Sequence, residues 1–195
     1  DILFGGDMGE WVKFANALRA KIALRLADAN ASVAKSEFES AITNVISSDV
    51  SYPYLAEAAN QNPWYGRFLT RTDYAVSDVF VDYLKSLNDP RLLMYAEPAP
   101  NYDDGDGVME FSDINGMPYD TPNPGDITNA EVSFPSRHIG AAGPGVGIQD
   151  APLPVVTMAE MHFAMAEAAQ RGWSVPGGGA ADHYAMGVKE SMEQW

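Results

Sequence analysis

The segment at residues 60–65 brings amide and aromatic side chains together over consecutive positions. Its members are Asn60, Gln61, Asn62, Pro63, Trp64 and Tyr65. Flat aromatic rings stack on the apolar faces of ring-shaped ligands such as sugars, while amide groups hydrogen-bond to hydroxyls. A rigid aromatic platform also loses little conformational entropy on binding. The segment therefore predicts a stacking site, with the alternative that Trp64 packs this loop onto neighbouring helices.

Two tyrosines extend this candidate site along the sequence. Tyr54 precedes the segment by a few residues, and Tyr102 lies in a loop-rich region further on. Loops on a rigid scaffold carry binding residues disproportionately often, although exposed tyrosines are also common. The predicted ligand-binding residues are therefore Asn60, Gln61, Asn62, Trp64, Tyr65, Tyr54 and Tyr102.

An acidic turn at residues 103–107 has the composition of a calcium-binding loop. It reads Asp-Asp-Gly-Asp-Gly, and Ca²⁺ prefers several carboxylate and carbonyl oxygens on a tight turn. The full calcium-loop pattern fails, because Val108 occupies a position that should supply an oxygen ligand. The turn predicts either a structural calcium site at Asp104 and Asp106 or an ordinary solvated loop. No other cofactor is expected.

The sequence contains no pattern typical of a catalytic centre. Cysteine is absent, which excludes a thiol nucleophile and disulfides. His138, His162 and His183 do not have the spacing of a zinc hydrolase, and no G-x-S-x-G motif is present. With 27 acidic residues, a catalytic carboxylate pair stays an open alternative, but no pair is singled out. We therefore predict a protein that is not an enzyme.

The composition indicates a folded, acidic domain. The chain has 195 residues, of which 46% are hydrophobic and 20% charged, so it is long enough to bury a core. Its net charge of −15 argues against nucleic acid as a partner and against direct adsorption to anionic lipid. No apolar run approaches the roughly 20 residues that span a bilayer. Both ends fall within or beside helical patterns, so we expect a fragment of a longer protein.

Hydrophobic periodicity predicts a mainly α fold. Apolar residues recur at spacings of three and four in the segments where we expect helices, which are residues 8–28, 36–47, 73–87, 157–171 and 180–195. The intervening regions 48–71 and 91–156 are rich in Pro and Gly and predict an irregular insertion with short strands. Residues 91–97 are expected to form a short strand or an extended segment, and residues 132–134 another short strand. The helical hairpins are tetratricopeptide-like in style, although no strict repeat of about 34 residues occurs. Residues 1–195 are treated as one domain.

Local signals refine the expected helices. Ser36 with Glu39 and Thr157 with Glu160 have the spacing of capping boxes at helix starts. Gly172 follows the fourth helix where a terminating glycine belongs. The first helix is expected to bury its large apolar residues, which are Trp11, Phe14, Leu18, Ile22 and Leu26. Small residues in the last two helices, including Gly187, favour close packing.

Four sequence blocks resemble the SusD/RagB-like family of nutrient-binding outer-membrane lipoproteins. Residues 11–25 resemble the family's W-x-K-F-x-N-[SA]-L block, and residues 62–64 its N-P-W block. Residues 87–91, Leu-Asn-Asp-Pro-Arg, resemble its N-D-P-R block, and residues 159–195 resemble its final helical block. The blocks occur in the expected order across nearly the whole chain, which makes the resemblance specific.

The resemblance implies a function as well as a fold. Members of this family are tetratricopeptide-like superhelices with an irregular ligand-binding part, held at the outer-membrane surface by an N-terminal lipid. They cover a TonB-dependent SusC-like transporter and pass oligosaccharides to it without cleaving them; RagB-like members take peptides, and some relatives hold calcium. The lipid-bearing cysteine is not among these residues, so membrane contact is expected only through an anchor outside them. The alternative is a helical-repeat module that binds only protein.

Overall fold

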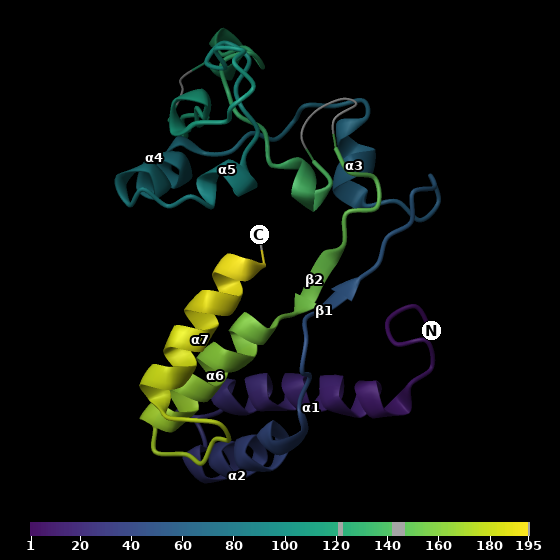
Figure 1. Cartoon of the computed structure of the whole chain (residues 1–195), viewed down its shortest axis with the longest axis vertical. Coiled ribbons are helices and arrows are strands. Elements are labelled where there is room, and N and C mark those ends of the chain that lie inside the picture. The colour runs from purple at the N-terminus through teal and green to yellow at the C-terminus, as the bar shows by residue number, and fades with distance from the viewer. Residues whose placement is uncertain (121–122, 142–146, 195) are drawn as a thin grey trace. The chain divides into compact units, whose positions relative to one another are not determined.

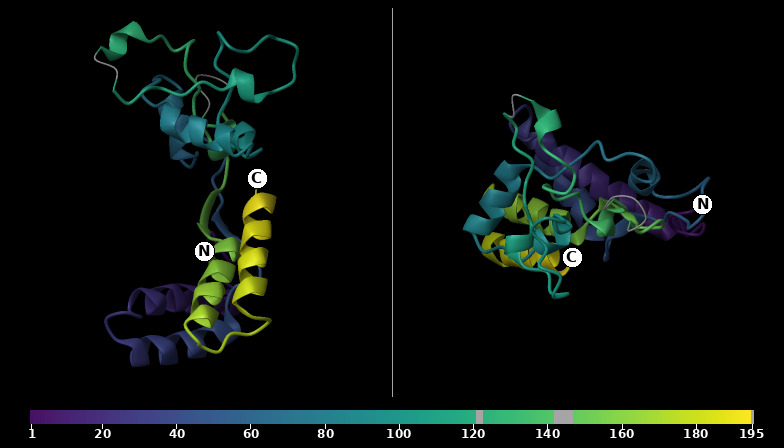
Figure 2. Two further views of the ribbon diagram at one scale, coloured as in Figure 1. Left: turned by 90° about the vertical axis from the view of Figure 1, so that its left-hand side faces the viewer. Right: turned by 90° about the horizontal axis from the view of Figure 1, so that it is seen from above.

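The computed structural model describes residues 1–120, 123–141 and 147–194, and divides the chain into two compact units (Figures 1 and 2). The helical unit comprises residues 1–52 and 154–195, and the inserted unit comprises residues 53–153. Trp195, which the sequence places at the end of the last helix, lies outside the described residues. The expected mainly α architecture with a loop-rich insertion is confirmed.

The helical unit is built from two pairs of helices and one small sheet. Its elements are α1 (Met8–Arg25), α2 (Ala31–Ala41), η1 (Ile42–Asn44), β1 (Val50–Tyr52), β2 (Leu153–Val156), α6 (Met158–Gln170) and α7 (Ala180–Glu193). Strands β1 and β2 form a two-stranded sheet. This sheet was not expected at these positions, because both strands fall in segments that read as irregular.

The core of the helical unit depends on small residues of α1. The buried residues of this helix are Ala17, Ala20 and Ala23. They let Phe38 of α2 and Met161 of α6 approach closely within one cluster. The predicted buried stripe is therefore wrong in its second half, because Leu18, Ile22 and Leu26 are exposed. Phe14 does pack against the core, and its ring contacts that of Trp11.

Helix α2 begins earlier than predicted. Asn30 is its N-cap, and the Asn30 side chain accepts a hydrogen bond from the backbone N–H of Val33 at 3.3 Å. The backbone N–H of Asn30 also donates to Leu26 at the end of α1, so one residue ends the first helix and starts the second. The capping box predicted at Ser36 is wrong for this reason, and α2 ends at Ala41 rather than residue 47.

The boundaries of α6 agree with the sequence signals. Thr157 and Glu160 form a reciprocal capping box at its start. At its end Gly172 has a positive φ of 76°, and the next backbone N–H, of Trp173, donates to Ala168 at 2.9 Å. Helix α7 packs against α6 through Gly187, where an added Cβ would lie 2.8 Å from the ring of Phe163. The expected close packing of these helices is confirmed.

The inserted unit has short helices joined by long connections. Its elements are α3 (Pro63–Phe68), α4 (Asp78–Ser86), α5 (Leu92–Tyr95) and the 3₁₀ turns η2 (Phe111–Asp113), η3 (Pro124–Asp126) and η4 (Arg137–Ile139). A separate core lies under α4 and α5, and its buried members are Val76, Val81, Leu84, Leu92, Ala96 and Ile114. Among the described residues, no helix is long and apolar enough to cross a membrane.

Helix α4 is shorter than predicted because its first expected turn is used elsewhere. Ser77 is the N-cap, and its hydroxyl accepts from the N–H of Phe80 at 3.3 Å. Just before it, the backbone of Val76 donates to Ser133 and accepts from Met117, at 2.9 and 2.7 Å. Val76 cannot make these bonds from within a helix, so the helix starts at Asp78 rather than residue 73.

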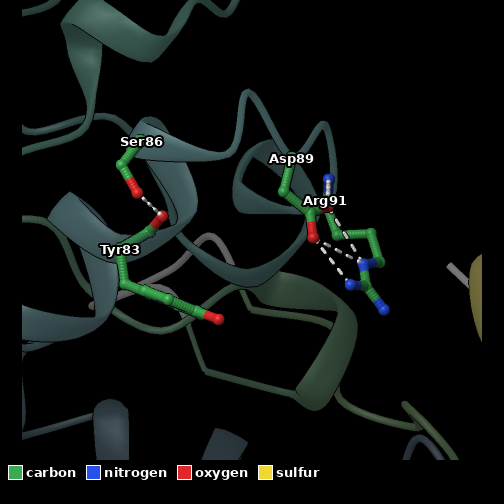
Figure 3. Close-up of polar contacts among 4 residues, drawn as sticks. All are labelled: Tyr83, Ser86, Asp89 and Arg91. Atoms are coloured by element: carbon green, nitrogen blue, oxygen red, sulfur yellow. Dashed lines mark hydrogen bonds and ion pairs between the residues drawn. The ribbon is translucent and has the colours of Figure 1, made fainter.

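The turn after α4 explains the Leu-Asn-Asp-Pro-Arg block (Figure 3). Asn88 adopts a left-handed conformation with φ 50°, and the N–H of Asp89 donates back to Leu84. The Asp89 carboxylate accepts from the backbone N–H of Arg91 at 3.0 Å and from its guanidinium at 2.6 Å. Hydrogen bonds from Arg91 lower the pKa of Asp89, and the same contact raises the pKa of Arg91.

This cap starts a helix where the sequence suggested an extended segment. Residues 92–95 form α5, so the short strand or extended segment predicted over 91–97 is wrong for these residues. The strand predicted over 132–134 is also absent from the described residues, although the segment is tied to the core by single hydrogen bonds. The N–H of Ser133 donates to Asn115 and the N–H of Glu97 donates to Phe134, at 2.7 and 2.9 Å.

Candidate functional site

A hollow of about 270 Å³ lies beside α3 in the inserted unit. It is lined by Tyr54, Asn62, Pro63, Trp64, Arg67, Tyr74 and Leu153. We call it the Trp64 hollow. It contains three of the predicted ligand-binding residues, Tyr54, Asn62 and Trp64, and brings them together with residues that the sequence did not suggest.

Asn62 fixes the position of α3 and so the position of Trp64. It is the N-cap of this helix, and its side-chain oxygen accepts from the N–H of Trp64 at 2.8 Å. Its amide nitrogen donates to the carbonyl of Ala151 at 2.8 Å, and its backbone N–H donates to Gln149 at 2.9 Å. Since the residue is buried, Asn62 acts as a positioning residue for α3, and its role as a ligand contact stays a prediction from the sequence.

Trp64 presents part of its ring to solvent. It is 38% exposed, and its ring meets that of Tyr74 edge-on, with centroids 5.3 Å apart. Phe68 of the same helix is fully buried, and the centroid of its ring lies 6.0 Å from that of Phe134. Phe68 therefore anchors α3, and Trp64 stays half-exposed beside the hollow. The Trp64 ring also contacts Phe68, with centroids 6.3 Å apart, so ligand stacking and packing both stay open for Trp64.

Arg67 and Tyr74 form a polar edge that sequence reasoning missed. A guanidinium nitrogen of Arg67 donates to the Tyr74 hydroxyl at 2.8 Å, and the guanidinium carbon lies 5.2 Å from the centre of the Tyr74 ring. Arg67 was detectable, because it follows Trp64 by three positions on the same helix and such residues share a face. Tyr74 lies ten positions from Trp64 along the chain, and no local pattern connects the two.

The other candidates of the 60–65 segment do not line the Trp64 hollow. Gln61 accepts from the side chain of Gln149 at 3.0 Å. The Tyr65 ring lies toward Gly147, where an added Cβ would be 3.1 Å from it. Asn60 is exposed and donates to the carboxylate of Glu57 at 2.6 Å. Their role in binding stays a prediction from the sequence.

The remaining predicted sites lie in the loop at residues 99–108. Tyr102 is exposed there and does not line the Trp64 hollow. The carboxylates of Asp103, Asp104 and Asp106 each accept from a backbone N–H two residues further on, at 2.7–3.1 Å. Within the described part of the chain, no group of three or more acidic or histidine side chains is arranged to hold a metal. Calcium at Asp104 and Asp106 therefore stays a prediction from the sequence.

Two histidines form a buried pair in the helical unit, apart from any predicted site. His162 of α6 and His183 of α7 are both buried, with their Nδ1 atoms 3.2 Å apart. Since a carbonyl only accepts, His183 Nε2 donates to Pro176 at 2.9 Å, and His162 then donates to His183 in the neutral pair. Burial and the nearby His183 lower the pKa of His162, and Glu190 opposes this shift. The pair links the two helices within the helical unit.

The fold combines helical hairpins with a loop-rich inserted unit. The whole chain, residues 1–195, matches the profile of a SusD-like family described as starch-binding and associating with the outer membrane. The chain belongs to this SusD-like family, which confirms the resemblance carried by its four sequence blocks. A comparison with curated proteins gives no significant match.

Solved structures show the same fold. A chitin-binding protein is 26% identical with a TM-score of 0.73, and covers 100% of this chain and 42% of its own length. A SusD homologue from Bacteroides thetaiotaomicron is 26% identical with a TM-score of 0.76, and the match covers 100% of this chain and 38% of the homologue. A chitin-binding SusD homologue from Flavobacterium johnsoniae is 24% identical with a TM-score of 0.74, and the match covers 100% of this chain and 37% of the homologue. The chain thus spans about two fifths of the length of these relatives.

Proposed function

We propose that this chain is part of a receptor that binds oligosaccharides without cleaving them, and that the Trp64 hollow contacts the sugar. The observation that carries the proposal is the half-exposed indole ring of Trp64 at the wall of a hollow in the inserted unit. Membership of a family described as starch-binding supports it, as does the likeness to a chitin-binding protein at 26% identity.

The lining of the hollow has the chemistry of sugar recognition. Trp64, Tyr74 and Leu153 offer apolar surface to the C–H face of a pyranose, and Tyr54 and Arg67 offer polar groups to its hydroxyls. The volume of about 270 Å³ is near the lower end of ligand sites, which is about 300 Å³. We therefore expect it to hold a short stretch of a longer oligosaccharide.

The same lining favours binding over catalysis. Glycoside hydrolysis needs a carboxyl group to protonate the leaving oxygen and a second carboxylate, in most families, on the other side of the bond. Among the described residues that line the hollow there is no carboxylate and no imidazole. Among the described lining residues, a sugar held against Trp64 would therefore meet none of the carboxyl or imidazole groups that glycoside hydrolysis most often uses.

We further propose that the full protein acts at the outer-membrane surface. The family description, which includes association with the outer membrane, supports this location. There the receptor would pass its ligand to a SusC-like TonB-dependent transporter. A lipid attached outside these residues would anchor the receptor to the membrane. Two alternative functions are open to test. The protein would bind peptides, as RagB-like proteins do, or it would bind only other proteins.

Isothermal titration calorimetry with the 195-residue chain tests the binding proposal. Chito- and malto-oligosaccharides and a peptide panel are the ligands, and we expect Trp64→Ala to weaken saccharide binding about 30-fold, as for a central aromatic contact. Tyr83→Ala is the matched control, because Tyr83 is an exposed aromatic of the same unit that does not line the hollow.

The outcomes separate the alternatives. Saccharide binding that Trp64→Ala weakens and Tyr83→Ala leaves unchanged supports the proposal. Binding of peptides in place of sugars, or of no small ligand at all, contradicts it. Release of reducing sugar from any bound glycan would show an enzyme rather than a receptor.

A further inference from the structure

Arg67 is the charged side chain among the described residues that line the Trp64 hollow. Its guanidinium is held beside the Tyr74 ring by one hydrogen bond to the Tyr74 hydroxyl. A guanidinium carries five N–H donors, so this bond leaves most of them available. The Tyr74 contact also restricts the side chain before any ligand arrives, which reduces the entropy lost on binding.

Most arginines of this chain have a carboxylate close enough to neutralise their charge, whereas Arg67 has none among the described residues. Each of the following lies within 4 Å of a carboxylate: Arg19, Arg71, Arg91, Arg137 and Arg171. Along the described part of the chain, Arg67 has no carboxylate at that distance, although the protein carries a net charge of −15. Acidic side chains are therefore abundant, yet none of those in the described ranges pairs with the arginine at the hollow.

An anionic ligand group would supply the missing partner. Arginine binds a carboxylate or a sulfate through two parallel hydrogen bonds, which are stronger than bonds to neutral hydroxyls. The net negative charge of the chain opposes the approach of such a ligand from a distance. A preference for it would consequently have to arise from short-range contact with Arg67 rather than from the overall field.

We propose that the Trp64 hollow selects a sugar residue that carries an anionic group, with Trp64 stacking on the pyranose ring and Arg67 binding the anion as the specificity-determining residue. This inference rests on the proposed glycan-binding function and names its ligand class. The anion is a carboxylate, as in a uronic acid, or a sulfate ester. Both present oxygens that a guanidinium binds in the same way.

Paired ligands that differ only in the anionic group test the inference. The first pair is a galacturonic acid tetramer and the same tetramer with methyl-esterified carboxyls. The second pair is a sulfated galactose tetramer and its desulfated form. By calorimetry we expect the anionic member of at least one pair to bind about 10-fold to 100-fold more tightly than its neutral partner. The pair that shows the preference identifies the anion.

Variants assign the preference to Arg67. Arg67→Gln should abolish it, and Arg67→Lys should reduce it, because lysine keeps the charge but loses the two-bond geometry. Arg71→Gln is the matched control, since Arg71 is exposed, lies four residues further on and pairs with Asp73 at 2.9 Å. Thermal unfolding of each variant checks that the inserted unit stays folded.

The experiment distinguishes a loss of the anion preference from a loss of glycan binding itself. Equal binding of anionic and neutral tetramers, weakened by Trp64→Ala, overturns the anion preference and leaves glycan binding intact. A preference that survives in Arg67→Gln also overturns it. Binding of none of these tetramers or of the neutral chito- and malto-oligosaccharides contradicts both proposals, and preferential binding of acidic peptides contradicts the ligand class.

Discussion

Asn62→Ala is expected to destabilise the inserted unit more than most single substitutions do. The substitution removes the N-cap bond to Trp64, which is worth about 1 kcal/mol. It also leaves the buried carbonyl of Ala151 without its 2.8 Å donor, which costs about 1–3 kcal/mol. Because Asn62 is buried, water cannot replace either bond without entering the packed region. We expect a loss of about 2–4 kcal/mol in the free energy of unfolding.

Urea unfolding followed by near-ultraviolet circular dichroism measures this loss, and hydrogen exchange resolved by peptide locates it. Protection should fall in residues 62–68, and saccharide binding should weaken because Trp64 is no longer fixed. Asn60→Ala is the matched control, since Asn60 is exposed and its side chain bonds to the exposed Glu57. We expect it to cost less than about 0.5 kcal/mol. Equal costs for the two variants would refute the reasoning that burial makes the Asn62 amide structurally important.

Three further perturbations test separate features. Gly116→Ala should cost about 1–3 kcal/mol, because the new Cβ would lie 2.3 Å from the backbone of Asp78; an unchanged urea midpoint would contradict this. Gly172→Ala should cost only about 1 kcal/mol from its left-handed conformation, since no atom lies within 4 Å of the added Cβ; a larger shift in the thermal midpoint would show a missed contact. Because the pKa of His162 is lowered in the folded chain, the unfolded chain binds the proton more readily, and stability should fall as the pH drops below about 6.5. His162→Gln should lessen the fall in unfolding free energy between about pH 6.5 and pH 5.5 relative to the unsubstituted chain. A pH dependence identical to that of the unsubstituted chain would contradict the assignment.

The helix boundaries that the sequence predicted correctly are those set by local hydrogen bonds. Thr157 and Glu160 satisfy each other at the start of α6, and Gly172 supplies the left-handed residue at its end. Such signals involve only residues within one or two turns. Helix α4 shows the opposite case, because Val76 bonds to Ser133 and Met117. These partners are distant in the sequence, and no periodicity of residues 73–87 reveals them.

The buried face of α1 was mispredicted for a different reason. This helix carries large apolar residues on one face and alanines on another, and both faces fit an amphipathic pattern. Packing selects Ala17 and Ala20, because small residues allow Phe38 and Met161 to approach. Ile22 is left exposed. Hydrophobicity alone gives no information on which face the neighbouring helices contact.

The candidate site could be located from the sequence only in part. Of the amide and aromatic segment at 60–65, the structure places Asn62, Pro63 and Trp64 in the lining of the hollow. The contacts of the individual side chains could not be predicted, because Asn62 bonds to backbone groups and Tyr65 lies toward Gly147. Arg67 and Tyr74 complete the lining, and Tyr74 joins them only through the tertiary fold.

The paired strands β1 and β2 have an evolutionary consequence. The chain leaves the helical unit after Tyr52 and returns to it at Pro154, and the sheet already holds these two points together. A segment joined through adjacent ends can be lengthened, shortened or exchanged at a small cost in loop-closure entropy. The helical frame can therefore be inherited unchanged while the segment between the strands is replaced, so new ligand preferences can arise without redesign of the frame's own core.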